Sequence, residues 1–117
     1  MGKRFWTVVA VFTALQIAMV VAGHYSPAVA QGFAVGGMGL SLLAGVAVAW
    51  RASASLSQAA LRGAVAGGVC AFIGIAVSLL LGDVEPMLLA LGTLSSAVAG
   101  AIGGAVARLL GGRTASA

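Results

Sequence analysis

Apolar residues along the chain run in four long, nearly unbroken stretches that short polar segments separate. Each stretch has about 20 residues, and at a rise of about 1.5 Å per residue such a helix crosses the roughly 30 Å hydrocarbon core of a bilayer. The pattern therefore predicts an all-α integral membrane bundle of four transmembrane helices in a single domain, residues 1–117. The expected spans are 5–23, 29–50, 63–82 and 87–110, with an earlier start near Leu56 left open for the third.

The composition agrees with a chain that is surrounded by lipid. Of the 117 residues, 62% are hydrophobic and 7% are charged, whereas a soluble domain has about 25% charged residues. A chain of this length could not hide so much apolar surface from water, so we expect the bilayer to be its solvent. Membrane lipids are therefore the first partners that the composition predicts.

The charged residues form two groups along the predicted helices. Asp83 and Glu85 lie between the third and fourth stretches, and the basic residues lie at the opposite helix ends. Because cytoplasmic loops are enriched in Lys and Arg, we expect both termini and the middle loop in the cytoplasm, with the chain in a bacterial inner (plasma) membrane. The net charge of +4 is spread over separate segments, so no nucleic acid is expected as a partner. The six basic residues are Lys3, Arg4, Arg51, Arg62, Arg108 and Arg113.

The segment Ala28-Val29-Ala30 matches the small-x-small pattern that signal peptidase cleaves. Cleavage after Ala30 would leave three helices instead of four. The preceding apolar run, 5–23, is longer than the usual 7–15 residues of a signal peptide's apolar region. We therefore expect the first helix to remain uncleaved.

Small residues recur at every fourth position on the second, third and fourth stretches. Such stripes let helix backbones touch, with dispersion and weak Cα–H···O contacts as the attraction. The stripes can pack the bundle against itself, and at least one can also form the face of a homo- or hetero-oligomer. The first stretch is interpreted as having no such stripe, and bulky residues such as Phe5, Trp6 and Phe12 predict a peripheral position for it. The predicted helix-packing residues are Gly37, Ser41, Gly45, Gly63, Gly67, Gly74, Ser78, Gly92, Ser96, Gly100 and Gly104.

Strongly polar side chains are rare inside the predicted spans. Gln16 either bonds across helices as structural glue or lines a polar path, for which Ser95 and Ser96 are the other candidates. No Asp, Glu, Lys, Arg or His lies deep in any stretch. Since carriers that are coupled to protons or cations need such groups, their absence argues against that class.

The remaining candidate residues do not form a recognisable reaction centre. His24 and Tyr25 are interpreted as an interfacial anchoring pair, Asp83 as a solvated residue or the N-cap of the following helix, and Cys70 as an unreactive filler. The sequence shows no nucleophile–base pair, phosphate-binding loop or metal-ligand spacing. We therefore expect no catalytic activity, no cofactor and no metal.

Two functions fit this sequence. The first is a non-catalytic accessory or scaffold subunit that packs through its glycine-rich faces into a larger assembly with other membrane proteins. The alternative is a homo-oligomeric channel or facilitator for a small solute or ion, with Gln16, Ser95 and Ser96 along the path. The two functions differ in whether the intact protein moves a solute across a membrane.

Overall fold

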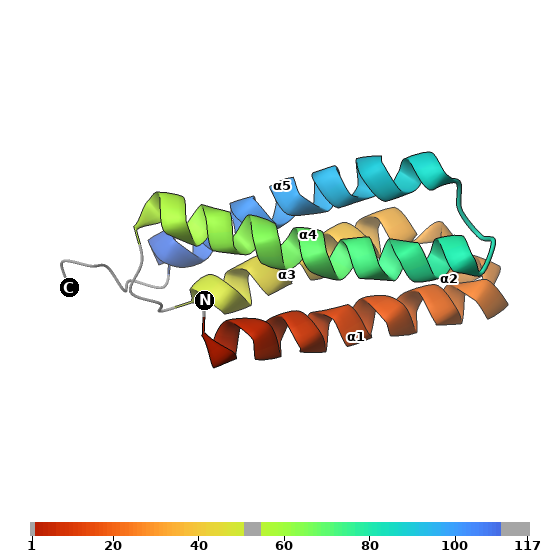
Figure 1. Cartoon of the computed structure of the whole chain (residues 1–117), viewed down its shortest axis with the longest axis horizontal. Coiled ribbons are helices and arrows are strands. Elements are labelled where there is room, and N and C mark those ends of the chain that lie inside the picture. The colour runs from red at the N-terminus through yellow and green to blue at the C-terminus, as the bar shows by residue number, and fades with distance from the viewer. Residues whose placement is uncertain (1, 51–54, 111–117) are drawn as a thin grey trace.

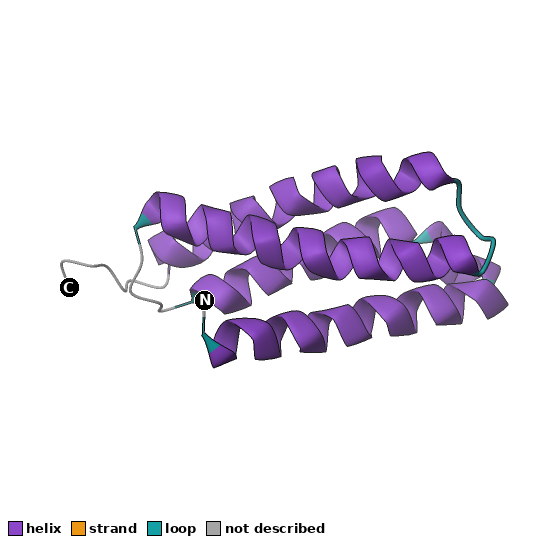
Figure 2. Cartoon of the chain, viewed as in Figure 1, coloured by secondary structure: helices purple, strands orange, loops and turns teal. Residues whose placement is uncertain are grey.

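The computed structural model describes residues 2–50 and 55–110, and this part of the chain consists of helices joined by turns (Figure 1), without strands (Figure 2). The all-helical architecture agrees with the predicted fold class. The first and fourth predicted spans match helices whose ends differ from the prediction by two residues or fewer. The helices are α1 (Lys3–Tyr25), α2 (Pro27–Gln31), α3 (Phe33–Ala49), α4 (Leu56–Leu80) and α5 (Pro86–Leu110).

The four longer helices form an elongated bundle in which successive helices run in opposite directions (Figure 1). α3 and α4 contact each other, and both also contact α1 and α5. Within the described residues, α1 and α5 do not contact each other. These two helices therefore form opposite edges of the bundle, with α3 and α4 between them.

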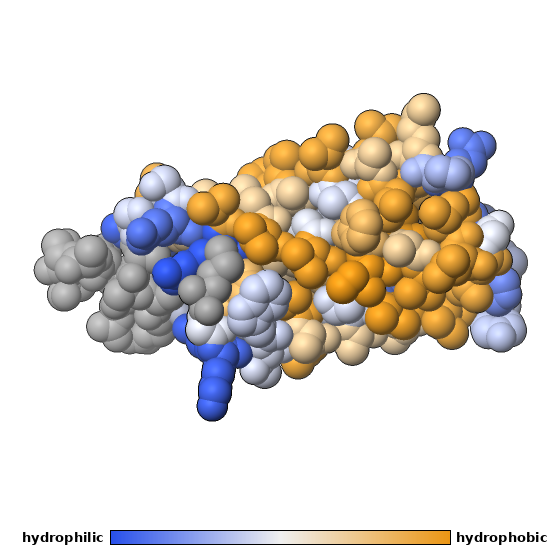
Figure 3. Space-filling view, in the orientation of Figure 1, coloured by the Kyte–Doolittle hydropathy of each residue, from blue (hydrophilic) through white to orange (hydrophobic). Residues whose placement is uncertain are grey.

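Three helices, α1, α4 and α5, are long and apolar enough to cross a membrane. α3, with 17 residues, is apolar but shorter. Apolar residues cover the middle of the face in Figure 3, and hydrophilic residues gather toward its two ends. The lengths and the apolar surface indicate an integral membrane protein.

The second predicted span, 29–50, is interrupted near its beginning, so the prediction of one continuous helix is wrong there. Ser26 caps α2 by accepting a hydrogen bond from the backbone N–H of Val29, and Pro27 occupies the first helical turn, where its missing N–H costs nothing. α2 ends at Gln31, Gly32 caps it, and α3 begins at Phe33. The small-x-small segment 28–30 lies within α2.

α4 takes the earlier of the two starts considered for the third span because Ser55 and Gln58 form a capping box. The Ser55 hydroxyl accepts from the N–H of Gln58, and the Gln58 side chain accepts from the N–H of Ser55, both at 3.2 Å. The polar segment between the second and third predicted spans therefore contributes its last residues, from Leu56 onward, to α4. Arg51 and Arg113, on which the charge pattern partly rests, lie outside the described residues.

The turn after α4 brings Asp83 back toward the bundle. Gly82 adopts a positive φ of 79°, which side chains disfavour and glycine tolerates. The N–H of Gly82 donates to the carbonyl of Leu79, and the N–H of Asp83 donates to the carbonyl of Ser78. This backbone-bonded turn holds the Asp83 carboxylate at the end of the bundle that also contains the end of α1.

Glycine backbones join α4, α5 and α3 in the half of the bundle that contains most of the basic residues. The carbonyl oxygen of Gly100 occupies the place that a Cβ on Gly63 would need, and the Gly63 carbonyl does the same to Gly100. Gly104 lies against the carbonyl of Ala59 in the same way, and Gly45 of α3 lies against Gly100. Backbone contact without intervening side chains holds these three helices at short separation.

α5 is held at a greater separation over its first turns. Gly92 contacts the side chain of Ile75 and not a backbone, so Ile75 stands between α5 and α4 at this level. α5 therefore packs through side chains in its first half and through glycines in its second half. Open space remains in the half of the bundle that contains the first turns of α5, from Pro86.

Candidate functional site: a cavity in one half of the bundle

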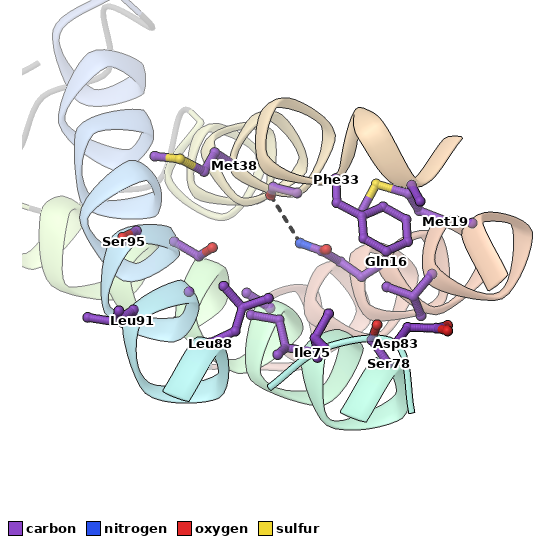
Figure 4. Close-up of a pocket in the computed structure, with 18 of the residues that line it drawn as sticks. Gln16, Met19, Phe33, Met38, Ile75, Ser78, Asp83, Leu88, Leu91 and Ser95 are labelled. Atoms are coloured by element: carbon purple, nitrogen blue, oxygen red, sulfur yellow. Dashed lines mark hydrogen bonds between the residues drawn. The ribbon is translucent and has the colours of Figure 1, made fainter. Parts of the chain in front are cut away.

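A cavity of about 600 Å³ lies in this half, and all five helices and the turn after α4 contribute to its walls. Sites for small ligands in proteins usually have volumes of about 300–1,000 Å³ and apolar walls. Figure 4 shows Gln16, Ile75 and Leu88 reaching from three different helices into the space between them. The apolar part of the lining includes Met19, Phe33, Met38, Ile75, Leu88 and Leu91.

The three residues that were predicted for a polar path, Gln16, Ser95 and Ser96, all line this cavity. They come from α1 and α5, which do not contact each other within the described chain. Gln16 is 2% exposed and Ser96 is 4% exposed, whereas Ser95 lies on the exposed side of α5. Side chains from two helices that do not contact each other therefore line one cavity.

The amide nitrogen of Gln16 links three helices. Its Nε2 lies 3.2 Å from the carbonyl oxygen of Gly37 and 3.3 Å from the hydroxyl of Ser41, both on α3, and 3.8 Å from the sulfur of Cys70 on α4. The Ser41 hydroxyl donates in turn to the carbonyl of Gly67 at 3.3 Å. Gln16 therefore has the structural role that the sequence suggested, through its nitrogen.

The side-chain oxygen of Gln16 is available to accept a hydrogen bond. Within the described residues no group donates to Oε1 of Gln16, which lies between Gly37 and Gly74. The Ser78 side chain also lines the cavity, and among the described residues its buried hydroxyl has no partner. Buried polar atoms are normally satisfied, so the buried Ser78 hydroxyl beside this cavity points to a missing polar partner or solvent.

The end of the cavity at the turn after α4, here called its mouth, has a carboxylate. Asp83 lines the cavity, and its Oδ2 lies 2.8 Å from Nδ1 of His24 at the end of α1. The two side chains are 29% and 34% exposed. The interpretation of Asp83 as a solvated residue or helix cap missed this pairing, because α5 begins at Pro86 and the turn directs Asp83 toward α1 instead.

An aromatic ring lies beside this mouth. Phe33, the first residue of α3, lines the cavity, and its ring lies against Gly23 so closely that a Cβ there would overlap it. Gly23 also lines the cavity. His24 and Tyr25, which were predicted to be an interfacial pair, contact each other edge to face at a ring separation of 5.0 Å.

The predicted helix-packing residues lie at two kinds of position. Gly45, Gly63, Gly67, Gly100 and Gly104 each lie against the backbone of another helix of the same chain. The others face side chains or are small side chains in the interior. Gly37 and Gly74 face Gln16, Gly92 faces Ile75, and Ser41, Ser78 and Ser96 are buried.

α1 has a small-residue stripe that the sequence interpretation missed. Ala10, Ala14, Ala18 and Ala22 follow one another at intervals of four, and all four are exposed on the outside of the bundle. Bulky residues elsewhere on this helix, such as Phe5, Trp6 and Phe12, led to the interpretation that it has no stripe. Of the small-residue stripes considered, this one lies open on the surface of the chain.

No group of three or more potential metal ligands occurs among the described residues. No protein-family model, curated protein or solved structure matches this chain.

Proposed function

We propose that this chain is a non-catalytic membrane protein that binds a small, largely apolar solute in the cavity and acts as an uncoupled facilitator for it. The observation that carries this proposal is that Gln16, Ser95 and Ser96 line one cavity of ligand size. No charged residue lies deep in the predicted membrane spans, which fits transport that is not coupled to protons or cations.

The charge distribution supports an orientation in which the cavity opens toward the outer side of a bacterial inner membrane. Lys3, Arg4 and Arg108 lie at the end of the bundle opposite Asp83 and Glu85. Under the positive-inside rule the basic end is cytoplasmic, and so are both termini. In this orientation the solute enters from the outer leaflet or the outer aqueous phase.

Binding of triphenylphosphine oxide, a neutral aromatic probe, tests this proposal with a matched pair of variants. In Gly37→Leu the new side chain enters the cavity next to Gln16 and Met19, whereas in Gly39→Leu it enters open space outside the bundle. Equilibrium dialysis of the protein in lipid nanodiscs, corrected for empty discs, measures the protein-dependent binding. We expect saturable binding to the wild type and Gly39→Leu and at least a tenfold loss, about 1.4 kcal/mol, in Gly37→Leu.

The same nanodisc experiment can contradict the proposal. Equal binding to the two variants would show that the cavity is not the site. Absence of saturable binding by neutral, cationic and anionic aromatic probes alike would show that the cavity takes no such solute. Transport is then measured in proteoliposomes as protein-dependent release of whichever probe binds.

The exposed alanine stripe favours a second function, that of an accessory subunit. The glycines first expected to meet partners are in contact within the chain, so a partner helix would find its close-packing face on α1 at Ala10, Ala14, Ala18 and Ala22. We expect Ala14→Leu to dissociate a partner and the neighbouring exposed change Val11→Leu to leave it bound. Native mass spectrometry of protein extracted gently from its own membrane distinguishes these outcomes, and an unaccompanied wild-type chain would exclude this function.

A further inference from the structure

The electrostatic character of the cavity narrows the chemical class of its solute. This inference rests on the proposed function, since it assumes that the cavity binds a solute. The charged residue in the lining is a carboxylate, Asp83, and the described lining contains no Lys or Arg. Glu85 lies two residues farther along the same turn, and the basic residues lie in other parts of the chain.

The free polar atom of Gln16 carries a partial charge of the same sign as the Asp83 carboxylate. Gln16 uses its N–H groups on Gly37, Ser41 and Cys70, so the atom left over is the carbonyl oxygen. A carbonyl oxygen carries partial negative charge, and in surroundings of low dielectric constant its attraction for a cation is stronger than in water. Phe33 also lines the cavity, and the face of an aromatic ring attracts cations.

We propose that the cavity binds an organic cation with an apolar, aromatic body, with the positive charge near Asp83 and Phe33 and the body between Ile75, Leu88 and Met38. His24 is the other titratable group at this carboxylate, 2.8 Å away. With a neutral imidazole, the His24–Asp83 pair carries one negative charge, and this charge attracts a bound cation. An anion of the same shape faces like charge and finds no cationic side chain in the described lining.

Tetraphenylphosphonium and tetraphenylborate provide a test because they have nearly the same size and opposite charges. Binding of each to the protein in nanodiscs of zwitterionic lipid is measured by equilibrium dialysis against empty discs. We expect the cation to bind at least about tenfold more tightly than the anion. Asp83→Asn keeps an oxygen that accepts from His24 and removes the charge, so we expect it to weaken cation binding by about tenfold.

Two controls separate this inference from the function on which it rests. Glu85→Gln removes a carboxylate of the same turn that does not line the cavity, and we expect it to change cation binding less than Asp83→Asn does. Triphenylphosphine oxide shows whether the cavity of Asp83→Asn is intact, because its binding does not depend on charge. Persistent binding of this neutral probe, together with equal affinities for the two ions or with unchanged cation binding in Asp83→Asn, would overturn the cation assignment alone. Failure of all three probes would overturn the proposed function and this inference together.

Discussion

The carbonyl oxygen of Gly100 lies where the first side-chain atom of any other residue at position 63 would be, and the Gly63 carbonyl has the same relation to position 100. The contact is thus reciprocal, and neither position accepts even a methyl group unless α4 and α5 move apart. Gly45 of α3 lies against the same Gly100 carbonyl, so the backbones of three helices meet at this point.

Replacing Gly100 by Ala should therefore destabilise the bundle. The methyl group would overlap the Gly63 backbone, and overpacking of this kind costs about 1–3 kcal/mol. Gly39→Ala is the matched control, because a Cβ at position 39 meets nothing within 4 Å. Reversible unfolding in mixed micelles measures both variants, and equal stabilities would show that the close contact does not exist in the membrane.

Replacing Gln16 by Leu should weaken the attachment of α1 to α3 and α4. The change removes the donor to Gly37 and Ser41, and polar contacts between membrane helices contribute about 0.6–2 kcal/mol. Leu15→Ala, on the exposed side of the same helix, serves as the control. The free energy of unfolding is the measurement, and a Gln16→Leu protein as stable as the wild type would mean that the amide is unimportant for folding.

Replacing Arg4 by Met should loosen the last turn of α3. The Nη2 group of Arg4 donates to the carbonyl oxygens of Ala47 and Trp50 at 2.8 and 2.9 Å, where a helix end leaves carbonyls without intrahelical partners. We expect a loss of about 1 kcal/mol, visible as faster amide hydrogen exchange at the end of α3. Lys3→Met is the control for loss of charge, and unchanged exchange in Arg4→Met would contradict the capping role.

The proposed orientation predicts opposite accessibility at the two ends of the bundle. In intact cells, Glu85→Cys should react with a membrane-impermeant maleimide, and Lys3→Cys should react only after the membrane is permeabilised. The native Cys70 has no exposed surface in the bundle, so it adds little background. Labelling of Lys3→Cys from outside would reverse the orientation and place the cavity on the cytoplasmic side.

The sequence predicted those features of the fold that depend on hydropathy. Apolar length placed α1 and α5 to within two residues, because each is bounded by polar or charged residues. The break at Gly32 was missed because the segment around it is apolar except for Gln31, so hydropathy gave no boundary there. The length of an apolar stretch thus locates a membrane helix well, but it does not reveal an interruption inside the stretch.

The candidate site could be predicted only in part. Gln16, Ser95 and Ser96 were selected for their polarity, which is visible in the sequence, and they line the same cavity. The pairing of His24 with Asp83 spans 59 positions and depends on the turn at Gly82, so local pattern could not give it. Nor could the sequence show that glycines bring α5 close at one end while Ile75 holds it away at the other, which is the origin of the cavity.

The contact between Gly45 and Gly100 also bears on how the protein is made. A ribosome delivers α3 to the membrane before α4 and α5, so the glycine face of α3 has lipid beside it until translation passes residue 100. During that interval the nascent chain lacks the helix against which α3 packs most closely. α3 therefore reaches its final packing late in synthesis, and until then the chain is open to the proteases that act on incompletely folded chains.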